Sequence, residues 1–263
     1  MILDIDVNLD YGLSQPTDLL LQIEAADGVG QTILSSALDV VDHVHLARVA
    51  AQDNIGNRVW LRSEYRFQCH YTARCRIERP VLDITALHAV PPHLLPAEAV
   101  RYLMPSRYCP ADTFQNYVGS EFGMSEGGQK IQVMRDWIAE KLQYVSGSSE
   151  SSTSALDTFV QRRGVCRDFA HLMITFARAA AIPARFASVY APGVSPQDFH
   201  AVAEVYLAGA WHLVDPTGMS QPDTTVMVGV GLDAAEVAFL SAFGSIMLNA
   251  QSVMVSQVQQ TQG

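Results

Sequence analysis

The sequence is poor in lysine and in positive charge. Of its 17 basic residues only Lys130 and Lys141 are lysines, and 27 acidic residues give a formal net charge of −10. No run of positive charge occurs anywhere, so the electrostatic attraction that holds proteins on DNA, RNA or anionic membranes is missing. We therefore expect no nucleic-acid partner and no membrane partner.

Long apolar segments and closely paired cysteines are also missing. The amino terminus, MILDIDVNLDYG, has neither the basic start nor the apolar stretch of a signal peptide or membrane helix, so we expect a cytoplasmic protein. None of the four cysteines shows the CxxC spacing of a structural zinc site. Cys69 and Cys75 lie in one strand-like run, about 20 Å apart if extended, too far for a disulfide. The sequence predicts free thiols, no metal and no cofactor.

The first ninety residues have the pattern of β-strands. The chain has 263 residues, 49% of them hydrophobic and 17% charged, which is typical of a globular protein with a buried core. Leu3, Ile5, Val7 and Leu9 alternate with polar residues, and similar runs follow, separated by Asp-Asn and Gly-Asn turns. We expect a β-rich, sandwich-like domain over residues 1–90.

The rest of the chain changes from proline-rich to helical and then back to strand-like. Prolines at positions 91, 92, 96, 105 and 110 predict a connecting segment over 91–124. A second domain is expected over 125–263, with core motifs in 125–217 and a C-terminal helix and strand in 218–263. Its expected elements are a buried helix from Cys166 to just before Pro183, strands at 185–190, 200–207 and 211–215, a helix near 234–243 and a strand near 252–258. The order of strands, helices and strands predicts an α+β fold.

Cys166 is the thiol placed best for reactivity. It lies at the first turn of the predicted buried helix, where free backbone N–H groups and the positive end of the helix dipole stabilise a thiolate. Such a position can lower a cysteine pKa from about 8.5 to between roughly 3.5 and 7.5, and Arg167 adds positive potential. Buried cysteines are also often inert, so position alone leaves both interpretations open.

A thiol nucleophile needs a base, and His200 is the best candidate. His171 lies about 140° round the helix from Cys166 and does not face the same site. His200 opens a strand whose partner, after a two-residue turn at 208–209, ends at Asp215. That hairpin places His200 one diagonal step from Asp215, about 7 to 8 Å between Cβ atoms and within side-chain reach. The sequence thus predicts a Cys, His and Asp set with the roles of a protease triad, although each residue alone also has a structural explanation.

Two blocks, GVCRDFAHLMITFARAAAIPARFASVY and DFHAVAEVYLAGAWHLVDPT, resemble the transglutaminase-like superfamily. The segment RYLMPSRYCPAD and the β-rich amino terminus resemble its bacterial branch, whose members are often described as cysteine proteases. The resemblance implies that Cys166 is the nucleophile, His200 the general base and then acid, and Asp215 the residue that orients the imidazole. It also implies a papain-like core, with the nucleophile helix packed on an antiparallel sheet.

The implied chemistry is acyl transfer on a peptide or protein substrate. The Cys166 thiolate attacks a carboxamide carbonyl, and the Cys166 N–H with a second donor, for which Tyr144 is the candidate, holds the oxyanion. The thioester then passes to water or to an amine, and the sequence leaves hydrolysis and transamidation open. Asp168, two residues after the nucleophile, is a candidate for binding a substrate cation or for serving the helix dipole.

Other classes of protein remain as alternatives. A catalytically silent module would keep the same scaffold for binding, although loss of one of the three residues would then be expected. Arylamine acetyltransferases also use Cys, His and Asp, but their RGGxCxE surroundings are absent. A serine hydrolase is disfavoured because GSEFG at 119–123 lacks the GxSxG spacing.

Overall fold

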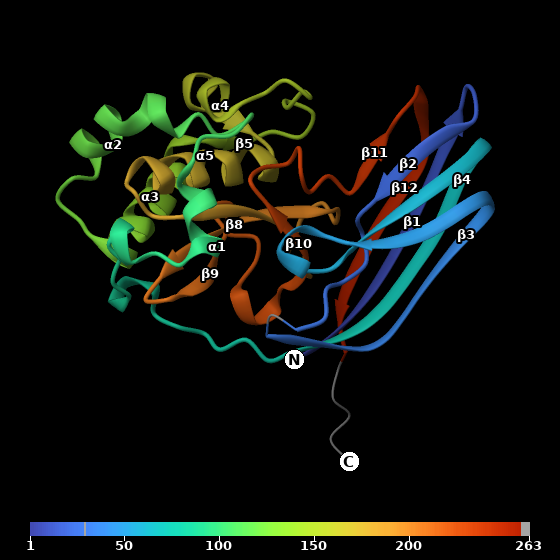
Figure 1. Cartoon of the computed structure of the whole chain (residues 1–263), viewed down its shortest axis with the longest axis horizontal. Coiled ribbons are helices and arrows are strands. Elements are labelled where there is room, and N and C mark those ends of the chain that lie inside the picture. The colour runs from blue at the N-terminus through green and yellow to red at the C-terminus, as the bar shows by residue number, and fades with distance from the viewer. Residues whose placement is uncertain (29, 259–263) are drawn as a thin grey trace, which may run out of the picture.

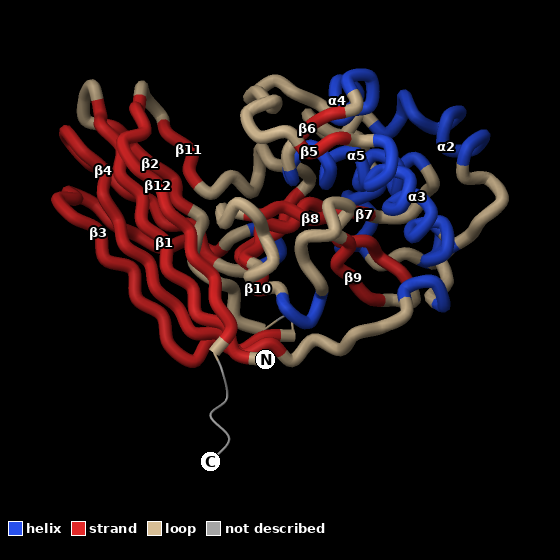
Figure 2. Tube along the Cα trace, turned by 180° about the vertical axis from the view of Figure 1, so that it is seen from behind, coloured by secondary structure: helices blue, strands red, loops and turns tan. Residues whose placement is uncertain are grey.

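The computed structural model describes residues 1–28 and 30–258, so residues 259–263 of the predicted second domain lie outside the described residues. A six-stranded antiparallel sheet stands beside a region in which helices pack around a four-stranded sheet (Figures 1 and 2). In the described part of the chain, no helix is long and apolar enough to cross a membrane.

The larger sheet forms because its strands alternate between buried apolar and exposed polar residues. Its strands are β1 (Ile2–Leu13), β2 (Thr17–Leu21), β3 (Gln31–Ala50), β4 (Asn57–Ile77), β11 (Leu240–Ala242) and β12 (Ile246–Gln257). The long β4 pairs with β3 along one side and with β1 and β2 along the other. The β-rich amino-terminal region is confirmed, but its strands join one sheet instead of the expected sandwich, because all of them pair directly or indirectly with β4.

Two strands of this sheet come from the end of the chain. β12 pairs with β1, placing Val255 opposite Ile5, and β11 pairs with β2. Val253 and Val255 are buried in the hydrophobic layer of the sheet. The strand pairing of residues 240–257 therefore differs from their expected placement in the second domain, because these valines complete the apolar face that β1 and β4 begin.

The helix expected near 234–243 is wrong, because the backbone of its second half pairs with β2 and its neighbours: Leu240–Ala242 form β11, Phe239 accepts the N–H of Gln22, and Phe243 donates to Asp18. Asp233 accepts the N–H of Ala235, at 2.9 Å, and the N–H of Tyr108, at 3.0 Å. Nε2 of His171, on the buried helix, accepts the N–H of Ala234 at 3.1 Å. Residues 232–239 consequently form a run of turns that leads into β11.

The smaller sheet carries the buried helix. The sheet has the order β10-β7-β8-β9, with β7 (Ala184–Tyr190), β8 (His200–Leu207), β9 (Ala210–Val214) and β10 (Val226–Gly231). The other elements are α1 (Ala97–Val100), α2 (Gln115–Glu121), α3 (Gly127–Lys141), α4 (Ala155–Gln161), α5 (Cys166–Ala179) and the short parallel pair β5 (Gln143–Tyr144) and β6 (Arg163–Gly164). In α5 every residue from Asp168 to Arg178 is buried, and the helix packs on β7 and β8. The predicted α+β fold, with the cysteine-bearing helix on an antiparallel sheet, is confirmed.

A buried charge cluster joins the two sheets. Arg185 of β7 donates to Glu204 of β8 at 2.7 Å, and to Asp53, in the turn between β3 and β4, at 2.9 Å. The hydroxyl of Tyr102 donates to the same Asp53 oxygen, and the Arg185 guanidinium lies 4.1 Å from the ring centroid of Trp211. The side chains of Arg185 and Glu204 are only 5% and 7% exposed. One shielded cation therefore links carboxylates from both parts of the molecule.

Replacement of Arg185 should destabilise the fold strongly. Arg185→Met removes the cation that hydrogen-bonds both Glu204 and Asp53, and we expect it to lower the free energy of unfolding by about 3 to 5 kcal/mol, measured by urea denaturation. Arg62→Met is the control, because Arg62 pairs with Asp18 at the surface and its loss should cost at most about 1 kcal/mol. Equal, small losses in both variants would contradict a structural role for the buried pair.

Candidate active site

The start of α5 is set by the side chain of Asp168. Its Oδ2 accepts the N–H of Val165 at 2.9 Å, and its Oδ1 accepts the hydroxyl of Ser149 at 2.9 Å. A Cβ on Gly164 would lie 2.6 Å from the Asp168 Cβ, so this close approach requires glycine. Cys166 is consequently the first residue of the helix and is half-buried, with its N–H at the positive end of the helix dipole.

The candidate role of Asp168 in binding a substrate cation needs correction. The residue is 1% exposed, and both of its carboxylate oxygens already accept hydrogen bonds from the chain. Nε of Arg167 lies 3.5 Å from Oδ1 and balances its charge. Asp168 therefore caps the helix and does not reach the cleft beside Cys166.

His200 and Asp215 are brought together by the hairpin of β8 and β9. The turn residues Ala208 and Gly209 have φ values of 49° and 83°, as a two-residue hairpin turn requires. Ala203 lies opposite Val214, which gives the register expected from the sequence. Nε2 of His200 lies 2.8 Å from Oδ2 of Asp215, and both side chains are almost fully buried.

The Asp215 carboxylate is held in place by further donors. Oδ1 accepts the N–H and hydroxyl of Thr217, at 2.8 and 2.7 Å, and Oδ2 accepts the N–H and hydroxyl of Ser220, at 2.9 and 2.8 Å. Burial opposes ionisation, but the hydrogen bonds and the charge of His200 outweigh it and hold the pKa of Asp215 below its ordinary value. The pair is therefore a fixed carboxylate bonded to one imidazole nitrogen.

The other imidazole nitrogen faces the thiol. Nδ1 of His200 has no hydrogen-bond partner within residues 1–28 and 30–258, and Sγ of Cys166 lies 4.0 Å from the carbonyl oxygen of Phe199, the preceding residue. Burial lowers the pKa of His200, but the hydrogen bond to Asp215 and the negative charges of Asp215 and Cys166 outweigh it and raise that pKa to about 9. The arrangement can stabilise an imidazolium ion beside a thiolate.

Tyr144 lies against Cys166 at the end of β5, next to β6. Burial and the negative charge of the Cys166 thiolate raise the pKa of the Tyr144 phenol to about 12, so the group stays protonated and can donate a hydrogen bond. Its ring also packs against Phe169, with 5.9 Å between centroids. Tyr144 therefore packs its ring against Phe169 and places its hydroxyl group near the thiol of Cys166.

A cleft of about 480 Å³ opens beside Cys166 and His200. The cleft lies between the α5 region and the large sheet, since Ser241 of β11 and Gln251 of β12 line it as well. Its other lining residues are Arg107, Tyr108, Ser151, Arg167, Phe186, Ser188, Asp198, Phe199, Ala201, Ala234, Ala235, Val237, Ala238 and Phe239. The sequence alone did not indicate that residues 107–108, 234–241 and β12 line the cleft, because only contacts between distant parts of the chain bring them near the thiol.

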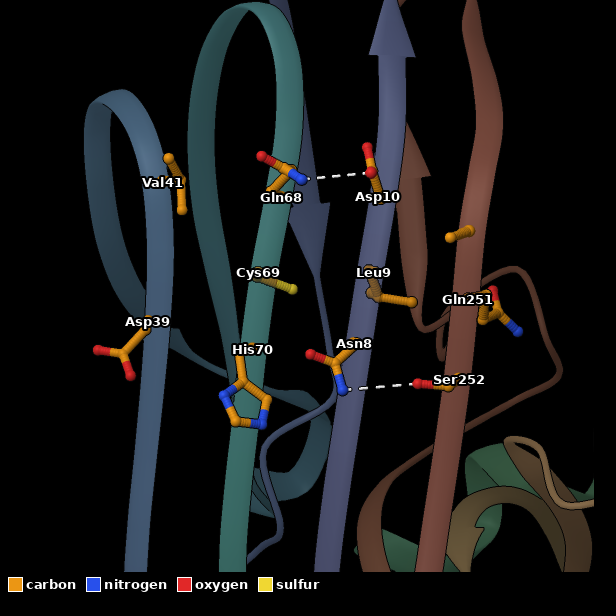
Figure 3. A pocket seen from close by; sticks show the side chains of 11 residues that line it. Asn8, Leu9, Asp10, Asp39, Val41, Gln68, Cys69, His70, Gln251 and Ser252 are labelled. Carbon is orange, nitrogen blue, oxygen red and sulfur yellow. Dashed lines mark hydrogen bonds between the residues drawn. The ribbon is translucent and has the colours of Figure 1, made fainter.

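A second hollow, of about 400 Å³, lies on the large sheet and has a different character (Figure 3). Gln68 donates to Asp10, and Asn8 donates to Ser252, across neighbouring strands. The thiol of Cys69 is buried there, and burial raises its pKa to about 12. Only the first of these two hollows combines an accessible thiol with an imidazole and a carboxylate.

Comparison with known proteins places this geometry in a family. The model of the transglutaminase-like superfamily matches residues 114–216, which include Cys166, His200 and Asp215. The crystal structure of a proposed cysteine protease from Cytophaga hutchinsonii superposes with a TM-score of 0.94 and 34% sequence identity, covering 99% of this chain and 92% of that chain.

Two curated relatives come from mycobacteria. An uncharacterized protein of Mycobacterium leprae is 33% identical over 153 residues, which is 54% of each chain. An uncharacterized protein of Mycobacterium tuberculosis is 32% identical over 143 residues, or 48% of this chain and 45% of that protein. The match thus spans about half the length of these curated relatives. From the family model and the full-length structural match together, the chain belongs to the transglutaminase-like superfamily.

Proposed function

We propose that this protein is a thiol-dependent acyl-transfer enzyme that acts on carboxamide or peptide bonds, with Cys166, His200 and Asp215 as its catalytic residues. The observation that carries the proposal is the 2.8 Å bond between His200 and Asp215, buried directly beside an accessible thiol at a helix start. The similarity to a proposed cysteine protease supports the same chemistry. Hydrolysis and transamidation have the same first half-reaction, in which the acyl group of the substrate is transferred to the thiol of Cys166.

The first half of the reaction forms a thioester. The thiolate of Cys166 attacks the carbonyl carbon, a C–S bond forms, and the carbonyl electrons move to oxygen. The developing oxyanion accepts hydrogen bonds from the Cys166 N–H and from the Tyr144 hydroxyl. Nδ1–H of the His200 imidazolium then protonates the leaving amine as the C–N bond breaks. Asp215 holds Nε2–H throughout, so the imidazole keeps its orientation.

The second half regenerates the thiol. Neutral His200 takes a proton from water or from an incoming amine, which attacks the thioester carbonyl. Collapse of the second tetrahedral intermediate breaks the C–S bond and returns the thiolate beside the imidazolium. Water gives a carboxylic acid, and an amine gives a new amide, so the acceptor that reaches the cleft decides the outcome.

The reactivity of each thiol tests the proposal most directly. We expect iodoacetamide at pH 7 to modify Cys166 at least about a hundredfold faster than Cys69, Cys75 or Cys109, as measured by peptide mass spectrometry. Burial raises the pKa of these three thiols to about 12, 11 and 12, so they serve as internal controls.

In His200→Ala the rate of Cys166 at pH 7 should fall well below that of the wild type, because the thiolate loses the imidazolium that stabilises it. A Cys166 as slow as the three buried thiols in the wild type would favour the alternative of a catalytically silent binding module.

Removal of the nucleophile should separate activity from stability. Cys166→Ala should abolish amide hydrolysis and amine exchange, while the midpoint of thermal unfolding stays within a few degrees of wild type, because the thiol is only half-buried. Activity is measured by amine release from a peptide library. Cys109→Ala is the contrasting variant: this thiol is fully buried and does not line the cleft, so its loss should lower the unfolding midpoint and spare activity. Activity that persists in Cys166→Ala would refute the assignment.

Stability should depend on pH through His200. Its pKa is about 9 in the folded chain and about 6.5 when unfolded, so the protonated ring stabilises the fold fully below about pH 6.5. This contribution, up to about 3 kcal/mol, is lost as the pH rises through 9. Urea unfolding at pH 6.5 and 9.5 should show the decrease in wild type and a smaller one in His200→Gln. Identical decreases in both proteins would show that His200 does not carry the effect.

A further inference from the structure

The charged side chains that line the cleft differ in their hydrogen-bond and ion-pair partners. Arg167 has its terminal nitrogen bonded to the hydroxyl of Ser149, at 2.9 Å, and to two backbone carbonyls of the same loop. The carboxylate of Asp168, 3.5 Å from its Nε, balances its charge. Arg167 therefore ties the 146–154 loop to α5, and its charge is paired with that of the buried Asp168.

Arg107 is different, because it has no anionic partner. Its exposed guanidinium lies 4.9 Å from the ring centroid of Tyr108, and in residues 1–28 and 30–258 it makes no ion pair or hydrogen bond. Tyr108 itself is rigid: its N–H donates to Asp233, its hydroxyl donates to the carbonyl of Ser151 at 2.7 Å, and its ring stacks on His171. The guanidinium of Arg107 thus lies at the cleft beside a tyrosine ring that three contacts hold in place.

The acid of the cleft lies on another segment. Asp198, two residues before His200, accepts the N–H of Phe199 and the side-chain N–H of Gln251, both at 2.8 Å. These neutral donors hold the Asp198 carboxylate against β12. Within the part of the chain that the structure describes, Asp198 therefore forms its hydrogen bonds with Phe199 and Gln251 and makes no ion pair with Arg107.

The lining around Arg107 favours a strong interaction with an anion. Phe186, Val237 and the stacked rings of Phe199 and Phe239, 4.3 Å apart, make much of the cleft wall apolar. A bound peptide would displace water from this wall, and charges then interact more strongly than in bulk water. The planar guanidinium fits a carboxylate with two parallel hydrogen bonds.

We propose that Arg107 is a specificity-determining residue that binds an acidic side chain of the substrate, so that the cleft selects peptides with Asp or Glu near the bond attacked by Cys166. The inference rests on the proposed function for its substrate class. The role of Arg107 concerns a residue outside the catalytic set. It can be tested without a known substrate, by the reaction of Cys166 with a negatively charged alkylating reagent.

Two alkylating reagents of similar size provide this test. Iodoacetate carries a carboxylate and iodoacetamide does not, so the ratio of their rates at Cys166, normalised to glutathione, reports the local attraction for a carboxylate. We expect Arg107→Gln to lower this ratio roughly threefold to tenfold at low salt, and less at high salt. Arg107→Lys should retain most of the ratio. Arg76→Gln removes an exposed charge on β4, outside the cleft, and should leave the ratio unchanged.

The outcomes separate this inference from the proposed function. A fast Cys166 whose ratio changes no more in Arg107→Gln than in Arg76→Gln overturns the role of Arg107 alone. A slow Cys166 whose ratio still falls in Arg107→Gln contradicts the proposed function and supports the carboxylate site.

A second measurement identifies the source of the carboxylate. An alanine hexapeptide with one central Glu and both ends blocked should slow the iodoacetamide reaction of wild type more than its Gln counterpart, and this difference should vanish in Arg107→Gln. If only an alanine peptide with a free carboxyl terminus protects Cys166, the ligand is a terminal carboxylate and the assignment to acidic side chains is overturned. The assignment is also overturned if neither the Glu peptide nor the peptide with a free carboxyl terminus slows the reaction of Cys166.

Discussion

Burial of charge is the constraint on which this site depends. Asp215 and His200 are almost completely removed from water, and a buried ion is tolerated only when hydrogen bonds and an opposite charge replace its hydration. Thr217 and Ser220 supply those hydrogen bonds to the carboxylate, and the carboxylate in turn favours a protonated ring. The protonation of His200 beside the Cys166 thiol therefore depends on two hydroxyl residues in the short loop after β9.

The large sheet contributes to the site as a wall. Its strand β12 brings Gln251 to the cleft, where the amide donates to Asp198, and the hydroxyl of Tyr11 donates to the same glutamine at 3.2 Å. The loop that precedes His200 is thereby attached to the sheet, and Arg185 attaches the opposite side of the small sheet to the β3–β4 turn. The histidine is held between two anchored segments, which limits the ways in which it can move relative to the thiol.

Short-range patterns in the sequence predicted the centre of the site, and long-range contacts decided its walls. The two-residue turn at 208–209 determines the register of β8 and β9, so the approach of His200 to Asp215 could be derived by counting. The helix expected near 234–243 failed because Leu240–Ala242 pair instead with β2, which is far away along the chain. Nothing local in the sequence indicates that β12 pairs with β1, since strand pairing depends on complementary faces that are remote along the chain.

The pairing of β12 with β1 also has a consequence for synthesis. β1 is translated before the α5 and β7–β10 region, and β12 is translated after it. Until β12 emerges, β1 has an open edge and the apolar face of the sheet lacks Val253 and Val255. Contacts between such distant segments fold slowly. The cleft can therefore be completed only after translation of β12, so a growing chain would carry the thiol well before it carries the finished cleft.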